Sequence, residues 1–488
     1  MNKYLWSAVA ALGGLAATVV GRAAWATSPE RPSVEAADVT ISDEAMERLA
    51  GALRHRTITA RAPEDRDDAA YADFRAYLRA KYPRVHEHLT RSVVNGHSVL
   101  YTWPGSNAAR APLVFMAHYD VVPVDEPADW THPPFGGVYD GTHVWGRGAL
   151  DDKASVCALF EAVDQLLAAG YQPQRTIHLA IGHDEEVGGA AGASAVAARI
   201  AADGPPPALV VDEGGALTEG ALPGIDAPIA FVGVAEKGYL SLALRATHPG
   251  GHSSVPTTRT SVDIITEAVQ RLRNTPLPAR LDGVTGTTFD TLTPAMPFVG
   301  RLIFANRWLF NGLAKKLLAR RAPSNAAIRT TTAPTRLTAG VKDNVVPSTA
   351  RATMNFRILP GQSVDDVHAH VADVLEDLPI ETHVVQAGEP TPVAPTTSDA
   401  FALVKDAIHA TGPRDVVVAP FVVPGTTDSR HYAPYTDRVY RFAPFRLTPD
   451  DQSRIHGVDE RISAADVARM IAFYRYLMAA GDELPVRG

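Results

Sequence analysis

Short apolar runs alternate with helix-length amphipathic segments along much of this chain, and this alternation restricts the fold more than any other feature of the sequence. Apolar runs at residues 112–122, 176–184 and 208–214 are separated by segments of helical periodicity at 154–169 and 192–201. Runs of this kind between helices are typical of parallel strands whose sheet is covered on both faces. The sequence therefore predicts an α/β fold with a mixed, mostly parallel sheet and helices on both sides.

The pattern changes at about residue 238. From there to residue 388, strands and helices follow in the order β-α-β-β-α-β, which is typical of a self-contained ferredoxin-like α+β unit. The predicted organisation is thus a leader at 1–26, a catalytic domain in two parts at 36–237 and 389–488, and an inserted domain at 238–388.

Composition narrows the function. The 488 residues carry a formal net charge of -8 and no long Lys/Arg run, which argues against a nucleic-acid partner. The sequence contains one cysteine, Cys157, so that neither an intramolecular disulfide nor a cysteine metal cluster can form.

The first residues form a leader. Lys3 precedes an apolar segment that ends in Ala24, Trp25 and Ala26, an A-x-A arrangement that predicts a signal peptide. The segment is also nearly long enough for an uncleaved membrane anchor. Both alternatives predict a protein that is exported: periplasmic, secreted or anchored outside the cytoplasm.

Polar residues end several of the apolar runs. Since active sites of open parallel sheets form beyond the carboxyl ends of the strands, these residues are the candidates for chemistry. Imidazole and carboxylate ligands without a thiolate suit zinc, manganese or cobalt, and adjacent glutamates can serve as one ligand and one base. The candidates are His118 and Asp120, Asp151 and Asp152, Glu185 and Glu186, Asp212 and Glu213, and His456.

The motifs around these residues, in chain order, are HYDVVP, GRGALDDK, DEEVGG, GGHSS, VKDNVVPS, NFRILPG and HGVDERI. In this order they resemble the co-catalytic zinc metallopeptidase family that includes aminoacylase-1, bacterial glutamate carboxypeptidase and succinyl-diaminopimelate desuccinylase. Within that family the chain looks closest to vacuolar carboxypeptidase S and to the secreted N-fatty-acyl-amino-acid synthase/hydrolase. The resemblance covers nearly the whole chain after the leader.

The resemblance implies two zinc ions, with Co2+ or Mn2+ as alternatives, and a cis peptide bond between Asp151 and Asp152. It implies that Glu185 is the general base and acid and that Asp120 orients a metal-binding histidine. The implied ligands are His118 and Asp212 on one ion, Glu186 and His456 on the other, and Asp151 as the bridge.

The resemblance also assigns roles outside the metal centre. It implies that the inserted domain is a lid or dimerisation domain, and that its residue His252 stabilises the oxyanion, in many relatives across a dimer interface. Asn344 and Arg357 are expected to bind substrate, the guanidinium of Arg357 by holding a carboxylate. Gly425 and Thr426, in the sequence PGTTDSRHY, are expected to line the substrate site.

A segment at about 293–322 is apolar at helical spacing with Arg and Lys interleaved, which predicts a basic amphipathic helix or helix pair. Three interpretations remain open at this point: a core or dimer interface, the wall of an apolar acyl pocket, or contact with a membrane surface.

These observations predict a metal-dependent hydrolase of an amide bond that releases a free amino acid. The substrate is a small molecule, either an N-fatty-acyl amino acid, with synthesis as the reverse reaction, or a short peptide cleaved as by carboxypeptidase S. The alternatives from other classes are a non-catalytic binder of N-acyl amino acids or peptides and a membrane-surface adaptor. The expected partners besides substrate are a lipid surface, through the leader and residues 293–322, and a second copy of the chain.

Overall fold

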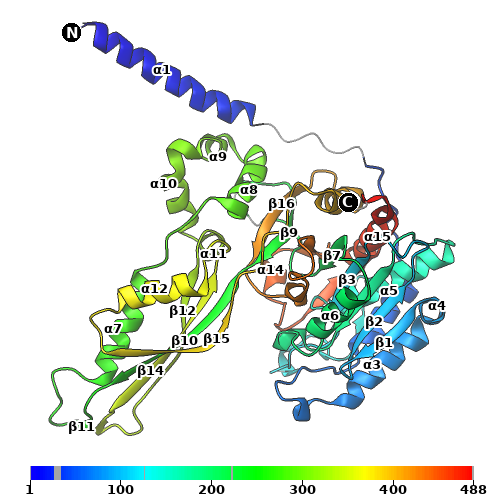
Figure 1. The fold of residues 1–488 in the computed structure, drawn as a ribbon, viewed down its shortest axis with the longest axis horizontal. Coiled ribbons are helices and arrows are strands. Elements are labelled where there is room, and N and C mark those ends of the chain that lie inside the picture. The colour runs from blue at the N-terminus through cyan, green and yellow to red at the C-terminus, as the bar shows by residue number, and fades with distance from the viewer. Residues whose placement is uncertain (1, 27–33, 126, 221, 223, 486–488) are drawn as a thin grey trace.

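The computed structural model describes residues 2–26, 34–125, 127–220, 222 and 224–485 (Figure 1). Residues 27–33, which belong to the polar stretch after the leader, lie outside the described residues. The fold consists of a large part built on one mixed sheet, which is the part predicted to be catalytic, and a smaller inserted unit with its own sheet (Figure 1). The larger part and its sheet are called the catalytic part and the catalytic sheet.

The catalytic sheet is parallel at its centre and contains antiparallel pairs toward both edges. Its strands are β1 (Thr90–Val94), β2 (Ser98–Trp103), β3 (Leu113–His118), β6 (Ile177–Gly182), β7 (Leu209–Asp212), β8 (Leu217–Thr218), β9 (Ile229–Glu236), β16 (Val417–Val423), β17 (Val439–Arg441) and β18 (Arg446–Leu447). In the described residues their order is β1-β2-β6-β3-β7-β17-β9-β8-β18, with β16 beside β9. β3 pairs parallel with both β6 and β7, whereas β2 pairs antiparallel with β1 and β6. A small sheet of β4 (Val138–Tyr139), β5 (His143–Trp145) and β19 (Arg461–Ser463) lies apart from it.

Helices cover both faces of this sheet. They are α2 (Asp43–Leu53), α3 (Asp68–Lys81), α4 (Pro83–His88), α5 (Lys153–Ala168), α6 (Ala193–Asp203), α13 (Asp399–Thr411) and α15 (Ala464–Ala480). The short helix α14 (Pro449–Gln452) buries none of its side chains. Along β3, Phe115 packs into the core formed with α5 and α15, and its neighbours Val114 and Met116 pack into the core formed with α6. Each side chain buried in this way contributes roughly 1.5–3 kcal/mol. Both faces of β3 are therefore buried under helices, as expected for a parallel strand inside an α/β fold. The predicted fold class is confirmed.

The inserted unit follows the predicted element order. Its elements are β10 (Gly238–Thr247), β11 (Gly251–His252), α7 (Ser261–Asn274), β12 (Thr331–Ala339), β13 (Val345–Val346), β14 (Thr349–Ile358), α12 (Val364–Val374) and β15 (Ile380–Gly388). The main strands form an antiparallel sheet in the order β12-β14-β10-β15, and α7 and α12 cover one of its faces. Both helices begin with a capping box, at Thr260 and at Ser363, which fixes where each one starts.

Between α7 and β12 the chain forms four helices: α8 (Gly283–Leu292), α9 (Phe298–Phe304), α10 (Arg307–Leu318) and α11 (Ala322–Ala327). They enclose a small core in which the rings of Phe289 and Phe304 stack at 5.0 Å and Leu318 is buried. The hydroxyl of Thr288 on α8 donates to the carbonyl of Pro420 at 2.6 Å, which joins these helices to β16 of the catalytic sheet. The segment predicted to be helical at 293–322 is therefore helical and packs as a cluster of short helices.

The leader forms a helix, α1 (Asn2–Trp25), whose C-terminal part packs against α9 (Figure 1). Within the described residues, no helix combines the length and the apolar character needed to cross a bilayer.

Two crossovers connect the inserted unit to the catalytic part. At the first, the Glu236 side chain bonds Arg441 Nε at 2.6 Å and Thr427 Oγ1 at 2.8 Å, both in the catalytic part. Its neighbour Lys237 donates from Nζ to the carbonyls of Ala326 and Arg329, which precede β12. At the second crossover, Thr391 exchanges hydrogen bonds with Glu236, and Ala394 N donates to Val234 O at 2.8 Å. Both crossovers are thus bonded to each other.

Candidate active site

The carboxyl ends of the parallel strands β3, β6 and β7 bring the predicted polar residues to one edge of the catalytic sheet. His118 ends β3, Glu185 and Glu186 open a short turn after β6, and Glu213 directly follows β7. Because parallel strands end at the same edge, residues far apart in sequence meet there.

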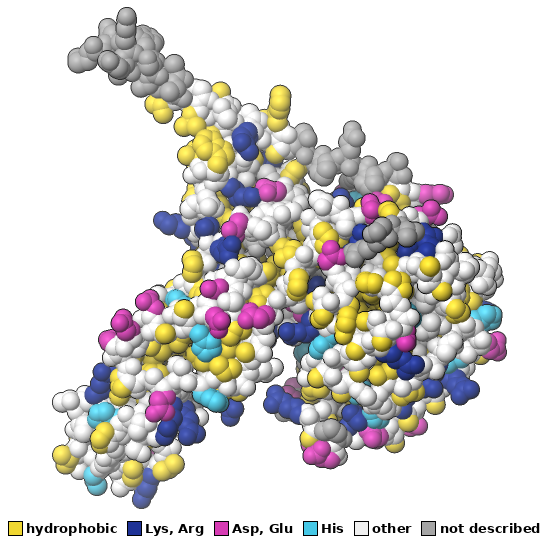
Figure 2. All heavy atoms as spheres, viewed as in Figure 1, with side chains coloured by type: hydrophobic (Ala, Val, Ile, Leu, Met, Phe, Trp, Pro, Cys, Tyr) yellow, Lys and Arg dark blue, Asp and Glu magenta, His cyan; other side chains and the backbone are white. Residues whose placement is uncertain are grey.

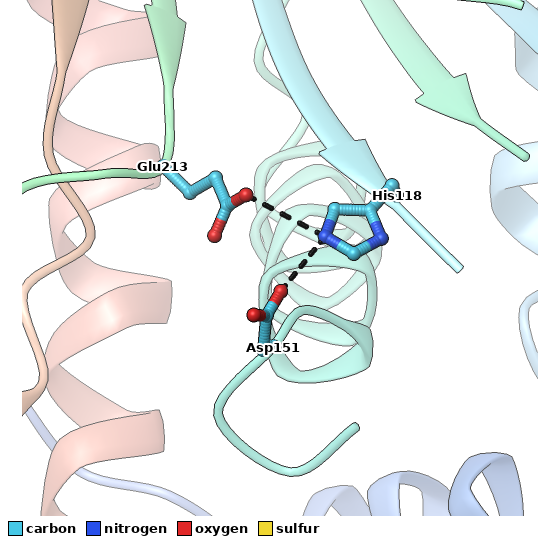
Figure 3. Close-up of side chains that lie close together, drawn as sticks. All are labelled: His118, Asp151 and Glu213. Carbon is cyan, nitrogen blue, oxygen red and sulfur yellow. Dashed lines mark hydrogen bonds and ion pairs between the residues drawn. The ribbon is translucent and has the colours of Figure 1, made fainter. Parts of the chain in front are cut away.

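One group of side chains surrounds His118 (Figure 3). Its Nε2 atom lies 2.9 Å from Asp151 Oδ1 and 3.5 Å from Glu213 Oε1. The imidazole is almost fully buried, whereas the two carboxylates retain partial solvent access. A histidine and two carboxylates thus converge on a common point.

A second group uses the other oxygen of Asp151. Asp151 Oδ2 lies 2.9 Å from His456 Nε2, and His456 Nε2 lies 3.3 Å from Glu186 Oε1. The ligand atoms of each group lie within 4.8 Å of one another, and Asp151 belongs to both. The peptide bond between Asp151 and Asp152 is cis, and His456 has a φ of 60°, a conformation that non-glycine residues rarely adopt and that often marks functional sites.

The electrostatics of both groups fit a cation. Burial alone would lower the pKa of His118, yet hydrogen bonds with Asp120 and Asp151 raise it well above its usual value. Hydrogen bonds with Asp151 and Glu186 raise the pKa of His456 to about 10. Excess carboxylate charge thus draws protons onto both imidazoles, and metal ions bind such sets by displacing those protons. The donors, imidazole and carboxylate without thiolate, suit zinc, cobalt or manganese.

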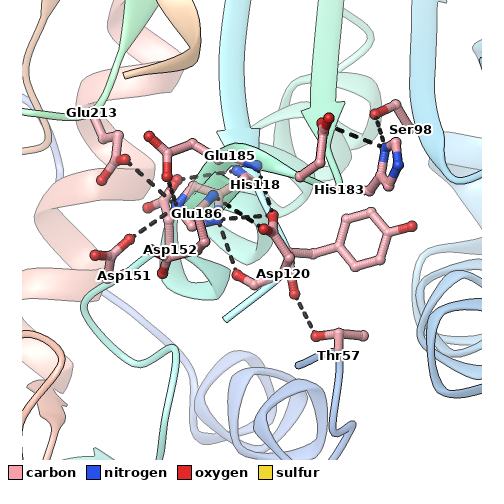
Figure 4. Close-up of polar contacts among 12 residues, drawn as sticks. Thr57, Ser98, His118, Asp120, Asp151, Asp152, His183, Glu185, Glu186 and Glu213 are labelled. Atoms are coloured by element: carbon pink, nitrogen blue, oxygen red, sulfur yellow. Dashed lines mark hydrogen bonds and ion pairs between the residues drawn. The ribbon is translucent and has the colours of Figure 1, made fainter. Parts of the chain in front are cut away.

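Asp120 and Glu185 lie beside these groups (Figure 4). Asp120 is fully buried; its Oδ1 lies 3.3 Å from His118 Nδ1, and its two carboxylate oxygens accept hydrogen bonds from the backbone N–H groups of Glu185 and Glu186. Glu185 Oε2 lies 4.0 Å from His118 Nε2, and burial raises the pKa of the Glu185 carboxyl well above its usual value. Asp120 therefore links the orientation of the histidine to that of the turn carrying the two glutamates.

Asp212, predicted as a ligand, lies elsewhere. Its carboxylate oxygen Oδ2 accepts the backbone N–H of Ser429 at 2.8 Å, in the turn Asp428–Tyr432, and so holds the segment that follows Gly425 and Thr426. Glu213, one residue later, points to the opposite side and approaches His118. In the structure Glu213, and not Asp212, lies beside His118 and Asp151, and this position favours Glu213 as the third ligand of the group.

Sequence reasoning missed the buried ion pair of Arg147 and Glu460. Arg147 Nη1 lies 2.6 Å from Glu460 Oε2, and Arg147 Nη2 donates to the carbonyl of His456. Glu460 Oε1 accepts the backbone N–H groups of Leu150 and Asp151 at 2.7 and 3.2 Å. The pair therefore holds the loop of Asp151 against the loop of His456. The only signal in the sequence is that both residues lie inside the motifs GRGALDDK and HGVDERI.

The predicted substrate residues of the inserted unit fall into two places. Arg357 on β14 is half-buried, and its guanidinium lies 4.7 Å from the ring centroid of Tyr239, next to the end of β10 that joins the catalytic part. His252 and Asn344 are exposed on β11 and just before β13, at the tip of the inserted sheet farthest from β3 and β7 (Figure 1). The imidazole Nδ1 of His252 is hydrogen-bonded within its own loop, to the backbone N–H and the hydroxyl of Ser254. Gly425 and Thr426 are partly exposed in the segment between β16 and the turn held by Asp212.

Comparisons with known proteins give one family match and several similar proteins. The sequence profile of the family described as Peptidase family M20/M25/M40 matches residues 114–480. The probable carboxypeptidase S-like 2 of Dictyostelium discoideum is 38% identical over 445 residues, covering 90% of this chain and 85% of the relative. The N-fatty-acyl-amino acid synthase/hydrolase PM20D1 of Homo sapiens is 38% identical over 441 residues, covering 89% and 87%. Among solved structures, the M20 family metallo-carboxypeptidase Sso-CP2 from Sulfolobus solfataricus matches with a TM-score of 0.67 at 18% identity, covering 91% of this chain and 100% of that chain.

Proposed function

This chain belongs to peptidase family M20/M25/M40 and is a metal-dependent amide hydrolase, and we propose that it cleaves N-fatty-acyl amino acids to a fatty acid and a free amino acid. The observation that carries hydrolysis at this site is Asp151, whose two oxygens face two different histidines, as a bridging ligand would. The fatty-acyl substrate is supported by the relatives named for it and by the apolar α9–α10 segment. The second candidate, cleavage of a C-terminal residue from a short peptide, is supported by the carboxypeptidase S relatives.

We propose that the site holds two zinc ions, with Co2+ or Mn2+ as alternatives. His118 and Glu213 would hold one ion, Glu186 and His456 the other, and Asp151 both. When bound, the ions would polarise the scissile carbonyl and make water acidic near neutral pH.

The side chains around that centre have separate roles in the proposed reaction. Glu185 takes the proton of the attacking water and returns it to the leaving nitrogen; its buried carboxyl, with a raised pKa, suits a group that must both accept and donate a proton. Asp120 fixes the ring of His118 and the turn of Glu185. Arg357, held over the ring of Tyr239, binds the carboxylate of the amino-acid product end.

Dimerisation and location are part of the proposal. His252 lies at the tip of the inserted unit, so we propose that it reaches the oxyanion in the site of a second copy, with the inserted unit as the dimerisation domain. The leader supports a location outside the cytoplasm, and contact with a lipid surface through the leader and residues 293–322 is proposed as well.

The test is hydrolysis of a matched panel followed by mass spectrometry. N-oleoyl-phenylalanine and N-oleoyl-glycine are compared with Gly-Leu and benzyloxycarbonyl-Gly-Leu, using metal-loaded wild type and Glu185→Gln. We expect cleavage of the oleoyl amides and a loss of roughly 10²–10⁴-fold in kcat for Glu185→Gln, the range of a general base. Metal content, measured on the same samples, should be unchanged in the variant.

Each other outcome has a definite meaning. Cleavage of the peptides alone replaces the fatty-acyl proposal by a peptidase. A Glu185→Gln variant as active as wild type removes the proposed mechanism, and binding without turnover by wild type favours the non-catalytic alternative.

A further inference from the structure

The helices α9 and α10 present apolar side chains to solvent instead of burying them. On α10, Ala314 and Leu318 are buried, whereas Leu309, Leu313 and Leu317 form a stripe at intervals of four residues and are exposed. Trp308 beside this stripe is 57% exposed, and Phe298 and Val299 on α9 are exposed too. Large apolar side chains that are exposed together on neighbouring helices mark a binding surface.

The charge of the same region is one-sided. The chain has a net charge of -8, yet residues 291–342 contain neither Asp nor Glu. Arg307 is neutralised by Asp290 at 2.7 Å. Lys316, Arg320 and Arg321 are exposed and have no ion-pair partner among the residues that the structure describes. Apolar and cationic side chains therefore share one surface, and Figure 2 shows such side chains close together around these helices.

The leader helix extends this surface. Asn306, fully buried between α9 and α10, donates from Nδ2 to the carbonyl of Val19 at 3.0 Å, and Arg22 Nε donates to the carbonyl of Ala305 at 3.2 Å. Ala23 is buried in this contact, whereas Val20 and Trp25 of α1 remain exposed. No acidic residue occurs in α1. We define the C-terminal part of α1 together with α9 and α10 as the basic-apolar platform.

We propose that the basic-apolar platform adsorbs to the surface of an anionic bilayer, with α1 as a built-in part of it. Exposed leucines enter the headgroup boundary, Trp308 occupies the interface where indole rings are favoured, and Lys316 and Arg320 contact anionic headgroups. The lack of acidic residues in α1, α9 and α10 favours this partner, because basic side chains among exposed apolar ones are attracted to anionic headgroups. The inference deepens the proposed lipid contact and does not depend on the proposed hydrolysis.

The experiment is vesicle flotation of the full chain. Vesicles of phosphatidylcholine with about 30% phosphatidylglycerol are compared with pure phosphatidylcholine, and the variants are Lys316→Gln/Arg320→Gln and Leu309→Ser/Leu313→Ser. The matched control is Arg79→Gln/Lys81→Gln, which removes the same charge from two exposed residues at the end of α3. Circular dichroism verifies that each variant is folded.

We expect wild type and control to float with the anionic vesicles. The partition coefficient of the Lys316/Arg320 variant should be roughly 30-fold lower than that of wild type. Each basic side chain near an anionic surface raises the partition coefficient about fivefold, and the variant lacks two of them. Raising the salt to about 0.5 M should release wild type in the same way. The Leu309/Leu313 variant should bind less to both vesicle types.

Two results would overturn the inference. Equal flotation of wild type and the Lys316/Arg320 variant would remove the anionic bilayer as partner. If the Leu309/Leu313 variant instead turns a dimer into a monomer in sedimentation velocity while its flotation is unchanged, the platform is an interface between two copies. Because flotation measures binding without turnover, either result is independent of whether N-acyl amino acids are cleaved.

Discussion

The edge of the catalytic sheet buries polar side chains, whereas the basic-apolar platform exposes apolar ones. Both regions therefore depart from the usual distribution of side chains, in which polar groups are exposed and apolar groups are buried. At the sheet edge, His118, Asp120 and Glu460 are charged or polar and buried. On the platform, Trp308 and Leu313 are apolar and exposed. Each arrangement costs stability by itself, so each indicates a ligand that offsets the cost: a cation at the first and an apolar, anionic partner at the second.

The two regions also differ in how firmly their unusual side chains are fixed. The buried charges are fixed by other buried groups, such as the ion pair of Arg147 and Glu460, and their geometry is rigid. The exposed leucines are held only by the helix that carries them. The difference teaches that the catalytic edge is preorganised for one ligand geometry, whereas the platform suits a deformable partner.

The largest effect is expected when a carboxylate of the candidate metal site is neutralised. Glu213→Gln should bind one metal ion fewer per chain than wild type and lose roughly 10³-fold in kcat/KM, or about 4 kcal/mol of transition-state stabilisation. Asp212→Asn, whose amide oxygen can still accept the N–H of Ser429, should retain its metal. Elemental analysis of the purified variants measures both; the reverse pattern would restore Asp212 as the ligand.

Next in size is the effect of removing a charge of the inserted unit that lies next to the catalytic part. Arg357→Gln should lower kcat/KM by roughly 100-fold, mainly through KM, because charge-assisted hydrogen bonds to the substrate carboxylate are lost. Arg351→Gln, on the same strand but exposed at its other end, should stay within about twofold. Steady-state kinetics with N-acyl amino acids and their methyl esters would reveal the carboxylate dependence; equal losses on esters would contradict the assignment.

Two substitutions on α10 compare the stability contribution of a buried leucine with that of an exposed one. Leu318→Ala should lower the free energy of unfolding by about 2–3 kcal/mol, because Leu318 is 9% exposed and packs with Phe289 and Phe304. Leu313→Ala, 45% exposed on the same helix, should change it by less than about 0.5 kcal/mol. Denaturant titration gives both values, and a large cost at Leu313 would mean that it is covered in solution.

The smallest expected effect concerns His178, a partly buried histidine that is not a candidate metal ligand. Burial lowers the pKa of His178, at the start of β6, to about 4, below the value of about 6.5 in an unfolded chain. The neutral ring is thus the form that folding favours, and its contribution of roughly 2 kcal/mol is present above pH 6.5 and lost as the pH falls toward 4. Wild type minus His178→Gln should therefore show this loss in unfolding free energy between pH 6.5 and 4, and parallel curves would contradict it.

The sequence predicted the catalytic edge better than the platform for a physical reason. Polar residues at the ends of parallel strands must meet, so His118 and Glu186 could be placed together from the pattern. Asp151 and His456 directly follow no parallel strand, and only the resemblance of their motifs assigned them to the metal centre. Asp212 and Glu213 are adjacent, and which of them faces the cluster depends on the hydrogen bond of Ser429, which lies 217 residues from Asp212. The alternation of apolar and polar residues along the strand does not contain this information. The pairing of Arg147 with Glu460, 313 residues apart, and the packing of α1 on α9 are long-range contacts of the same kind.

The two crossovers give the molecule a mechanical property. Neighbouring residues on a strand point in opposite directions, so Glu236 fastens the first crossover to the catalytic part while Lys237 fastens it to the inserted unit. Thr391 and Ala394 tie the second crossover to the first. Bending at the first crossover would break the bonds of two buried charges, and the hydrogen bond that joins α8 to β16 opposes rotation of the inserted unit as well. The base of the inserted unit is therefore expected to be stiff against the catalytic part, so that movement is largest at the tip that carries β11 and β13.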